Sequence, residues 1–182
     1  MKSYIGATIN DSMTEAQEMW VDVIVSVVTQ KKFNIEIGNM DYVLGNMVAK
    51  LVSSSKYYKI TEQALDYIHG IGINSKEPLH VKKHIYGKEK NTILEHIIPA
   101  SVIKKAVVQH RSDSEEIKRI LRNSGFVIIA TRTEDEMLKN AKLASKMPVN
   151  WSGFGDKPDK RYEAVGIQIS TTLIEHMGPI CR

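Results

Sequence analysis

Cysteine is nearly absent from this chain. The single Cys181 of the 182 residues can form neither an internal disulfide framework nor a cysteine-rich zinc site, which fits a reducing compartment. The first residues lack a basic segment followed by an apolar one, and no apolar run approaches the length that spans a bilayer. We therefore expect a cytoplasmic protein with no membrane partner.

Two common groups of catalytic motif are also missing. No glycine-rich phosphate-binding motif stands between a strand and a helix, which argues against ATP, GTP and dinucleotide enzymes. Serine and cysteine nucleophile elbows are absent, and we see no internal repeat. Any chemistry must depend on other residues.

What the chain does contain is enough apolar sequence to fold. Hydrophobic residues make up 42% of it, sufficient for one well-cored domain. We expect one compact domain with a helical N-terminal part, residues 1–75, and a second part, residues 76–182, that carries the chemistry.

Capping signals predict three helices in the N-terminal part. A capping box, Thr14 with Gln17, opens the first, which runs through Gln30. Asp41 and Thr61 are the expected caps of the next two. The alternating segment 33–38 is consistent with a short strand or an extended connector. Tyr57 and Tyr58 could be exposed at a helix junction, or they could contact nucleic acid.

The most informative stretch is residues 91–99, an apolar strand-like run that contains Glu95 and His96 and ends at Pro99. Neighbouring side chains of a strand point to opposite faces. The pair could therefore flank an ion and its substrate only if the sheet is exposed there.

The segment Glu95-His96-Ile97-Ile98-Pro99 resembles the first strand of the HNH, or ββα-metal, endonuclease superfamily. The resemblance implies that Glu95 holds a divalent cation, Mg²⁺ or Mn²⁺, and that His96 activates water against a phosphodiester. It also implies a second strand, matched by residues 125–131, and a helix, matched by a capping box at 133–136 and a helical pattern through Lys146.

The same resemblance suggests the supporting residues. Asn140 on the helix is the first choice for a second metal ligand, with Glu136 four residues earlier as the alternative or its support. Asn123 would orient the imidazole. Between the two strands, residues 100–124 predict two inserted helices, the second opened by a capping box at 112–115, and His110 between them is the alternative catalytic histidine.

Positive charge is concentrated around this stretch. Residues 76–124 hold eleven Lys and Arg against six Asp and Glu, more than the whole net charge of +4. Such clustering fits capture of a nucleic-acid backbone, although a solvated lysine-rich face is equally consistent with it. Arg161 could hold a phosphate or form an ion pair with an acid. The predicted phosphate contacts are Lys82, Lys83, Lys88, Lys90 and Arg161.

Together these patterns predict an α+β fold, predominantly helical, with a small ββα-metal-like unit in the C-terminal half. The expected function is metal-dependent hydrolysis of DNA phosphodiester bonds by a restriction- or phage-type endonuclease, with RNA left open as substrate. The alternative is a non-catalytic nucleic-acid-binding or regulatory protein that acts through a protein partner. We also expect a C₂ homodimer, because one active site cuts one strand and the N-terminal helices offer more apolar surface than a small nuclease unit needs.

Overall fold

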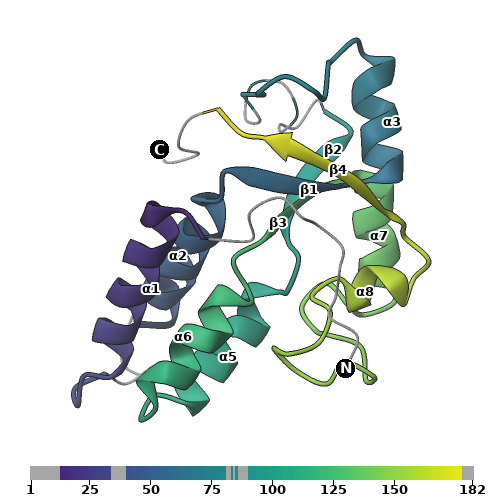
Figure 1. Ribbon diagram of the computed structural model, residues 1–182. Coiled ribbons are helices and arrows are strands. Elements are labelled where there is room, and N and C mark those ends of the chain that lie inside the picture. Colours follow the sequence, from purple (N-terminus) through teal and green to yellow (C-terminus); the bar gives the residue numbers. More distant parts are fainter. Residues whose placement is uncertain (1–12, 34–39, 81–82, 84, 86–89, 178–182) are drawn as a thin grey trace.

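The computed structural model describes residues 13–33, 40–80, 83, 85 and 90–177. Its centre is a four-stranded sheet in the order β2-β3-β1-β4 (Figure 1). The two inner strands, β1 and β3, run parallel, and each edge strand pairs antiparallel with its neighbour. The strands are β1 (Tyr57–Thr61), β2 (Thr92–His96), β3 (Val127–Thr131) and β4 (Ile169–Glu175).

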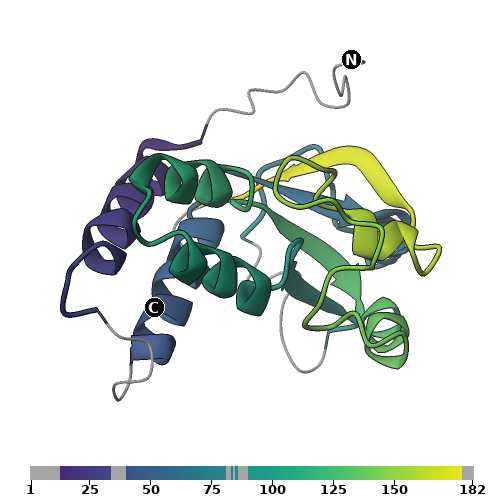
Figure 2. The same cartoon turned by 90° about the horizontal axis from the view of Figure 1, so that it is seen from below.

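Four helices gather beside the sheet, next to the points where β1 and β3 begin (Figures 1 and 2). Helix α1 packs on α2 and α6, and α5 packs on α2 and α6. The buried Gln17 side chain of α1 donates from Nε2 to the carbonyl of Gly125, 2.9 Å away, and so ties this group to the entry of β3. The four helices are α1 (Glu15–Val28), α2 (Met40–Ser53), α5 (Ala100–Gln109) and α6 (Ser114–Arg122).

The other ends of β1 and β3 lead directly into helices α3 (Glu62–Gly70) and α7 (Arg132–Asn140). In each case a buried threonine, Thr61 or Thr131, is both the last strand residue and the helix N-cap. Each strand has five residues and each helix nine, and a left-handed residue follows at the same offset, Gly72 with φ 78° and Lys142 with φ 61°. The chain therefore contains a strand-threonine-helix repeat that we did not expect from its sequence.

The two repeated units are bonded to each other through their caps. Thr61 Oγ1 donates to Glu134 Oε2 across 2.7 Å, and Thr131 Oγ1 lies 3.1 Å from Gln63 Oε1. Glu134 is only 3% exposed, and its Oε2 also accepts from the backbone N–H of Thr131 at 2.8 Å. A buried carboxylate is thus satisfied by both caps, as buried polar groups must be.

The mixed α and β architecture, with more helix than strand, agrees with the sequence prediction, whereas a separate small ββα unit is not confirmed. β2 and β3 do pair antiparallel, with α7 after β3, but both strands belong to the four-stranded sheet. The predicted first half also contributes β1 at the centre of that sheet. One cluster of buried hydrophobic residues runs through both halves of the chain.

Several local expectations are confirmed and others are wrong. The caps at Thr14 and Thr61 are present, and strands occur within 91–99 and 125–131. The N-cap of α6 is Asp113, not Ser112, since its carboxylate accepts from the N–H of Glu116 at 3.0 Å. The N-cap of α7 is Thr131, two residues before the predicted cap Thr133, and the helix ends at Asn140, short of Lys146. Residues 34–38 of the possible strand 33–38 lie outside the described residues.

The tyrosine pair is not an exposed helix junction, so that prediction is wrong. Tyr57 and Tyr58 belong to β1, and Tyr58 is fully buried against the ring of His176, with centroids 5.2 Å apart. This tyrosine is therefore part of the core.

Within the described ranges, no helix is long and apolar enough to cross a membrane.

Candidate functional site around Glu95 and Arg161

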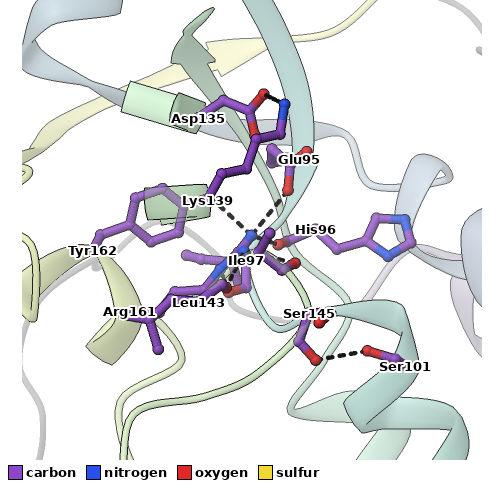
Figure 3. A network of polar contacts seen from close by, with 11 residues as sticks. Glu95, His96, Ile97, Ser101, Asp135, Lys139, Leu143, Ser145, Arg161 and Tyr162 are labelled. Carbon is purple, nitrogen blue, oxygen red and sulfur yellow. Dashed lines mark hydrogen bonds and ion pairs between the residues drawn. The ribbon is translucent and has the colours of Figure 1, made fainter. Parts of the chain in front are cut away.

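The Glu95-His96 pair lies at the end of β2, which is an edge strand of the sheet. Both side chains are partly exposed, and they point away from each other, as the alternation of a strand requires (Figure 3). Glu95 faces α7 and α8 (Lys160–Glu163), whereas the imidazole of His96 points to the other side. The pair is therefore accessible at a strand end, with its two functional groups on different faces.

Arg161 of α8 is the centre of the polar network on the Glu95 side (Figure 3). Its side chain is fully buried, and Nη2 lies 3.1 Å from Glu95 Oε2. The guanidinium also donates to the carbonyls of Ile97, 3.0 Å away, and Leu143, 3.1 Å away. It donates as well to the carbonyl of His96. Arg161 thus joins α8, the chain after α7 and the end of β2.

The ion pair with Glu95 confirms one of the two uses expected for Arg161. The predicted phosphate contact is not available to this side chain in the structure, because the guanidinium is buried and its donors are occupied by protein acceptors. Tyr162 completes the cluster: its hydroxyl accepts from Arg161 Nη2 at 3.1 Å, and burial raises the pKa of this phenol. The guanidinium of Arg161 is planar and has five N–H donors, so it can bond to several protein acceptors at once.

His96 differs from Glu95 in that its ring has no partner among the described residues. No hydrogen bond to its imidazole nitrogens occurs in the described part of the chain, although its backbone carbonyl accepts from Arg161. Burial lowers the pKa of the imidazole, and the nearby positive charge of Arg161 lowers it further. Both effects favour the neutral ring, which is the form that accepts a proton.

The face of α7 that approaches Glu95 carries Asp135 and Lys139, one turn apart (Figure 3). Lys139 Nζ lies 2.5 Å from Asp135 Oδ2. The pKa of Lys139 is raised, first by this hydrogen bond and charge, and also by the charges of Glu95 and Glu136. Glu136 and Asn140, the predicted metal ligands on this helix, directly follow Asp135 and Lys139 in sequence and are exposed. The structure therefore brings Asp135 and Lys139 to Glu95 instead of the predicted pair.

The remaining predicted residues are dispersed. Asn123 is the exposed C-cap of α6, and its side chain forms no hydrogen bond with His96 among the described residues. Lys83 is exposed and Lys90 half-buried. Lys90 precedes β2 and His96 ends it, so the two lie at opposite ends of this strand. Lys82 and Lys88 fall outside the described residues.

A divalent cation would find few ligands at this site. Glu95 has one oxygen, Oε1, that is not bonded to Arg161, and Asp135 is the nearest carboxylate that α7 presents to it. No group of three or more His, Cys, Asp or Glu side chains suited to a metal exists within the described ranges. Mg²⁺ is nevertheless often held by one or two carboxylates together with substrate phosphates. Glu95 and Asp135 fit that kind of binding.

Comparisons with protein families, with curated proteins and with solved structures gave no match. The function must therefore be argued from the site. Sequence reasoning had singled out Lys139 as able to reach a phosphate but missed Asp135, although the i, i+4 spacing of the two was a signal that they share a helix face. Their side of the helix could be recognised only once α7 was placed against β2.

Proposed function

We propose that this protein is a metal-dependent endonuclease that hydrolyses DNA phosphodiester bonds, with His96 as the general base. The observation that carries the proposal is the imidazole of His96: half-buried at the end of an edge strand, without a ring partner in the described residues, and with a lowered pKa. A neutral histidine of this kind can accept a proton from water that attacks phosphorus.

The surroundings of His96 support a polyanionic substrate. The basic segment, residues 76–90, leads directly into β2, the strand that ends at His96. The order β2, β3, α7 with antiparallel strands is also the order that the endonuclease resemblance implies. A cation bound by Glu95 and Asp135 would supply Lewis-acid stabilisation of the phosphate charge.

Arg161 has a separate part in this scheme. Its hydrogen bonds to Glu95 and to the carbonyls of His96 and Ile97 fix the end of β2, so that the acid and the imidazole are held in place. We therefore assign Arg161 as a positioning residue. Asn123, at the end of α6, could orient His96 only if this helix end approaches β2 when DNA is bound. The same condition applies to Asn140, at the end of α7, as a metal ligand.

The second candidate is a non-catalytic nucleic-acid-binding or regulatory protein. The observation that favours it is the pairing of Glu95 with Arg161, because a cation competing for this carboxylate meets two positive side chains, Arg161 and Lys139. In that case the basic segment alone would supply affinity for nucleic acid, and His96 would be a half-buried residue at a strand end without a catalytic role.

A cleavage assay separates the two candidates. Supercoiled plasmid and single-stranded DNA are incubated with the protein in Mg²⁺, in Mn²⁺ or in chelator, with binding measured in parallel. The nuclease proposal predicts cleavage that needs the metal and falls by roughly 10²–10⁴-fold in His96→Ala, with DNA binding retained. Glu95→Ala should instead raise the metal concentration needed for half-maximal activity.

His110→Ala is the matched control, because His110 is the exposed C-cap of α5 and contributes nothing to the network around Glu95. It should cleave like the wild type. Circular dichroism must show that every variant is folded. Full activity of folded His96→Ala would refute the role of this residue, and DNA binding without cleavage under any metal condition would establish the second candidate.

A further inference from the structure

A second polar site is an open cavity of about 540 Å³ lined by residues of α8, of the chain on both sides of it and of the first turn of α3. Its acidic residues are Glu62, Asp159 and Glu163, and its apolar wall is formed by Ile167 and Ile169. Neither Glu95 nor His96 lines it. The volume is in the range of small-molecule sites.

Asp159 is the observation that marks the cavity as a binding site. The residue is 9% exposed, and its buried Oδ1 has no hydrogen-bond partner among the residues that the structure describes. An aspartate at a helix N-cap normally accepts from the backbone N–H groups of the first turn, but this side chain makes no such bond. A buried, unpaired carboxylate is costly for a folded protein and calls for a partner.

The acidic charge around the cavity is only partly balanced by the described residues. Glu163 pairs with two lysines, Lys157 at 3.3 Å and Lys160 at 3.6 Å. Neither Glu62 nor Asp159 has an ion pair among the described residues. Two carboxylates therefore line the cavity without an ion-pair partner in the described part of the chain, although the formal net charge of the protein is +4.

We propose that this cavity binds a small organic cation, a molecule that joins a guanidinium or primary ammonium group to a short aliphatic portion. The cationic group donates to Asp159 and Glu62, and the aliphatic part packs on Ile167 and Ile169. A metal ion is the poorer occupant, since no three carboxylates in the described part of the chain are close enough to hold one. This inference does not depend on the proposed nuclease function.

Isothermal titration of the whole protein with agmatine tests the proposal directly. Agmatine carries both cationic groups on a four-carbon chain, N-butylurea is a neutral probe of similar shape, and CaCl₂ is the metal alone. We expect agmatine to bind, and N-butylurea to bind at least about tenfold more weakly because it lacks the charge-assisted hydrogen bonds. Binding of Ca²⁺ without binding of agmatine would overturn the proposal.

Asp159→Asn distinguishes a ligand-binding role from a structural one. It should weaken agmatine binding by about tenfold or more and, without ligand, leave the melting temperature equal or higher, because it removes an uncompensated buried charge. Glu62, exposed in α3, gives the variant Glu62→Gln, which tests the same site should the first variant fail to fold. Asp22→Asn, at an exposed acid of α1, is the control and should bind normally. Unchanged affinity in both pocket variants would refute the site.

Discussion

Removing the Arg161 side chain should destabilise the protein far more than removing any exposed arginine. In Arg161→Ala, Glu95 is left without its partner, and the carbonyls of Ile97 and Leu143 are left without donors that stand at 3.0 and 3.1 Å. Because Arg161 is fully buried, water cannot simply replace it. Three segments distant in sequence, namely β2, the chain after α7, and α8, are then no longer joined by a common side chain.

The size of the effect follows from these interactions. Breaking a buried ion pair by removing one partner costs roughly 3–5 kcal/mol. The side chain of Glu95 is 30% exposed, so rehydration of its carboxylate reduces the penalty. The orphaned carbonyls increase it, since an unsatisfied buried group costs about 1–3 kcal/mol. We therefore expect a loss of about 3–5 kcal/mol in the free energy of unfolding, or a melting temperature lower by roughly 6–20 °C for a chain of this length.

Urea unfolding followed by circular dichroism measures this loss. Arg122→Ala is the control: its ion pair with Glu18 is formed between side chains 49% and 42% exposed, and such pairs contribute about 0–1 kcal/mol. Arg161→Lys keeps the charge but loses the forked donor geometry, so its stability should lie between wild type and Arg161→Ala. Losses within about 1 kcal/mol of each other for Arg161→Ala and Arg122→Ala would refute the reasoning.

Three other features of the molecule can be tested in the same way. The folded-state pKa of His96 is lowered, so the unfolded state binds more protons at acidic pH. The free energy of unfolding should therefore fall as pH decreases through about 6.5, and it should fall less steeply in His96→Gln. Lys142 has the left-handed φ of 61°, so Lys142→Gly should raise the free energy of unfolding by about 1 kcal/mol. Gly72→Ala should lower it by about 1 kcal/mol through backbone strain alone, because a Cβ there would meet no atom within 4 Å. When three lysines of the basic segment, Lys82, Lys83 and Lys88, are changed to Gln, fluorescence titrations of DNA at several salt concentrations should show a shallower log–log dependence of affinity on salt, by about 0.9 for each phosphate that the protein no longer neutralises. Equal slopes for the variant and the wild type would mean that this segment is only solvated.

Local signals in the sequence were sufficient for much of the secondary structure. The boxes and caps at Thr14 and Thr61 predicted the starts of α1 and α3, because a cap is formed by residues three apart or less. The apolar runs around Glu95 and within 125–131 predicted β2 and β3. The expectation that Glu95 and His96 point to opposite faces is also confirmed, since it follows from strand geometry alone.

What the sequence could not provide depends on contacts between distant segments. β1 was missed because Tyr57-Tyr58-Lys59 has polar groups typical of an exposed segment, and only pairing with β3 and β4 makes it a central strand. The N-cap of α7 is Thr131, whose hydroxyl also contacts Gln63 of α3. The sequence around Thr133 gives no sign of this distant contact. Likewise Asp135 and Lys139 belong to the site only because α7 packs on β2.

The strand-threonine-helix repeat explains why these distant contacts are so specific. Parallel strands place their carboxyl ends side by side, so the two helix N-termini, each with unpaired N–H groups and a positive dipole end, meet at one place. Such a place attracts an anion, and here the protein supplies its own in the buried carboxylate of Glu134. The hydroxyls of Thr61 and Thr131 both contact Glu134 Oε2, at 2.7 and 3.0 Å, which fixes α7 relative to α3. Since α7 carries Asp135 and Lys139, this internal anion also determines which side chains of α7 face Glu95.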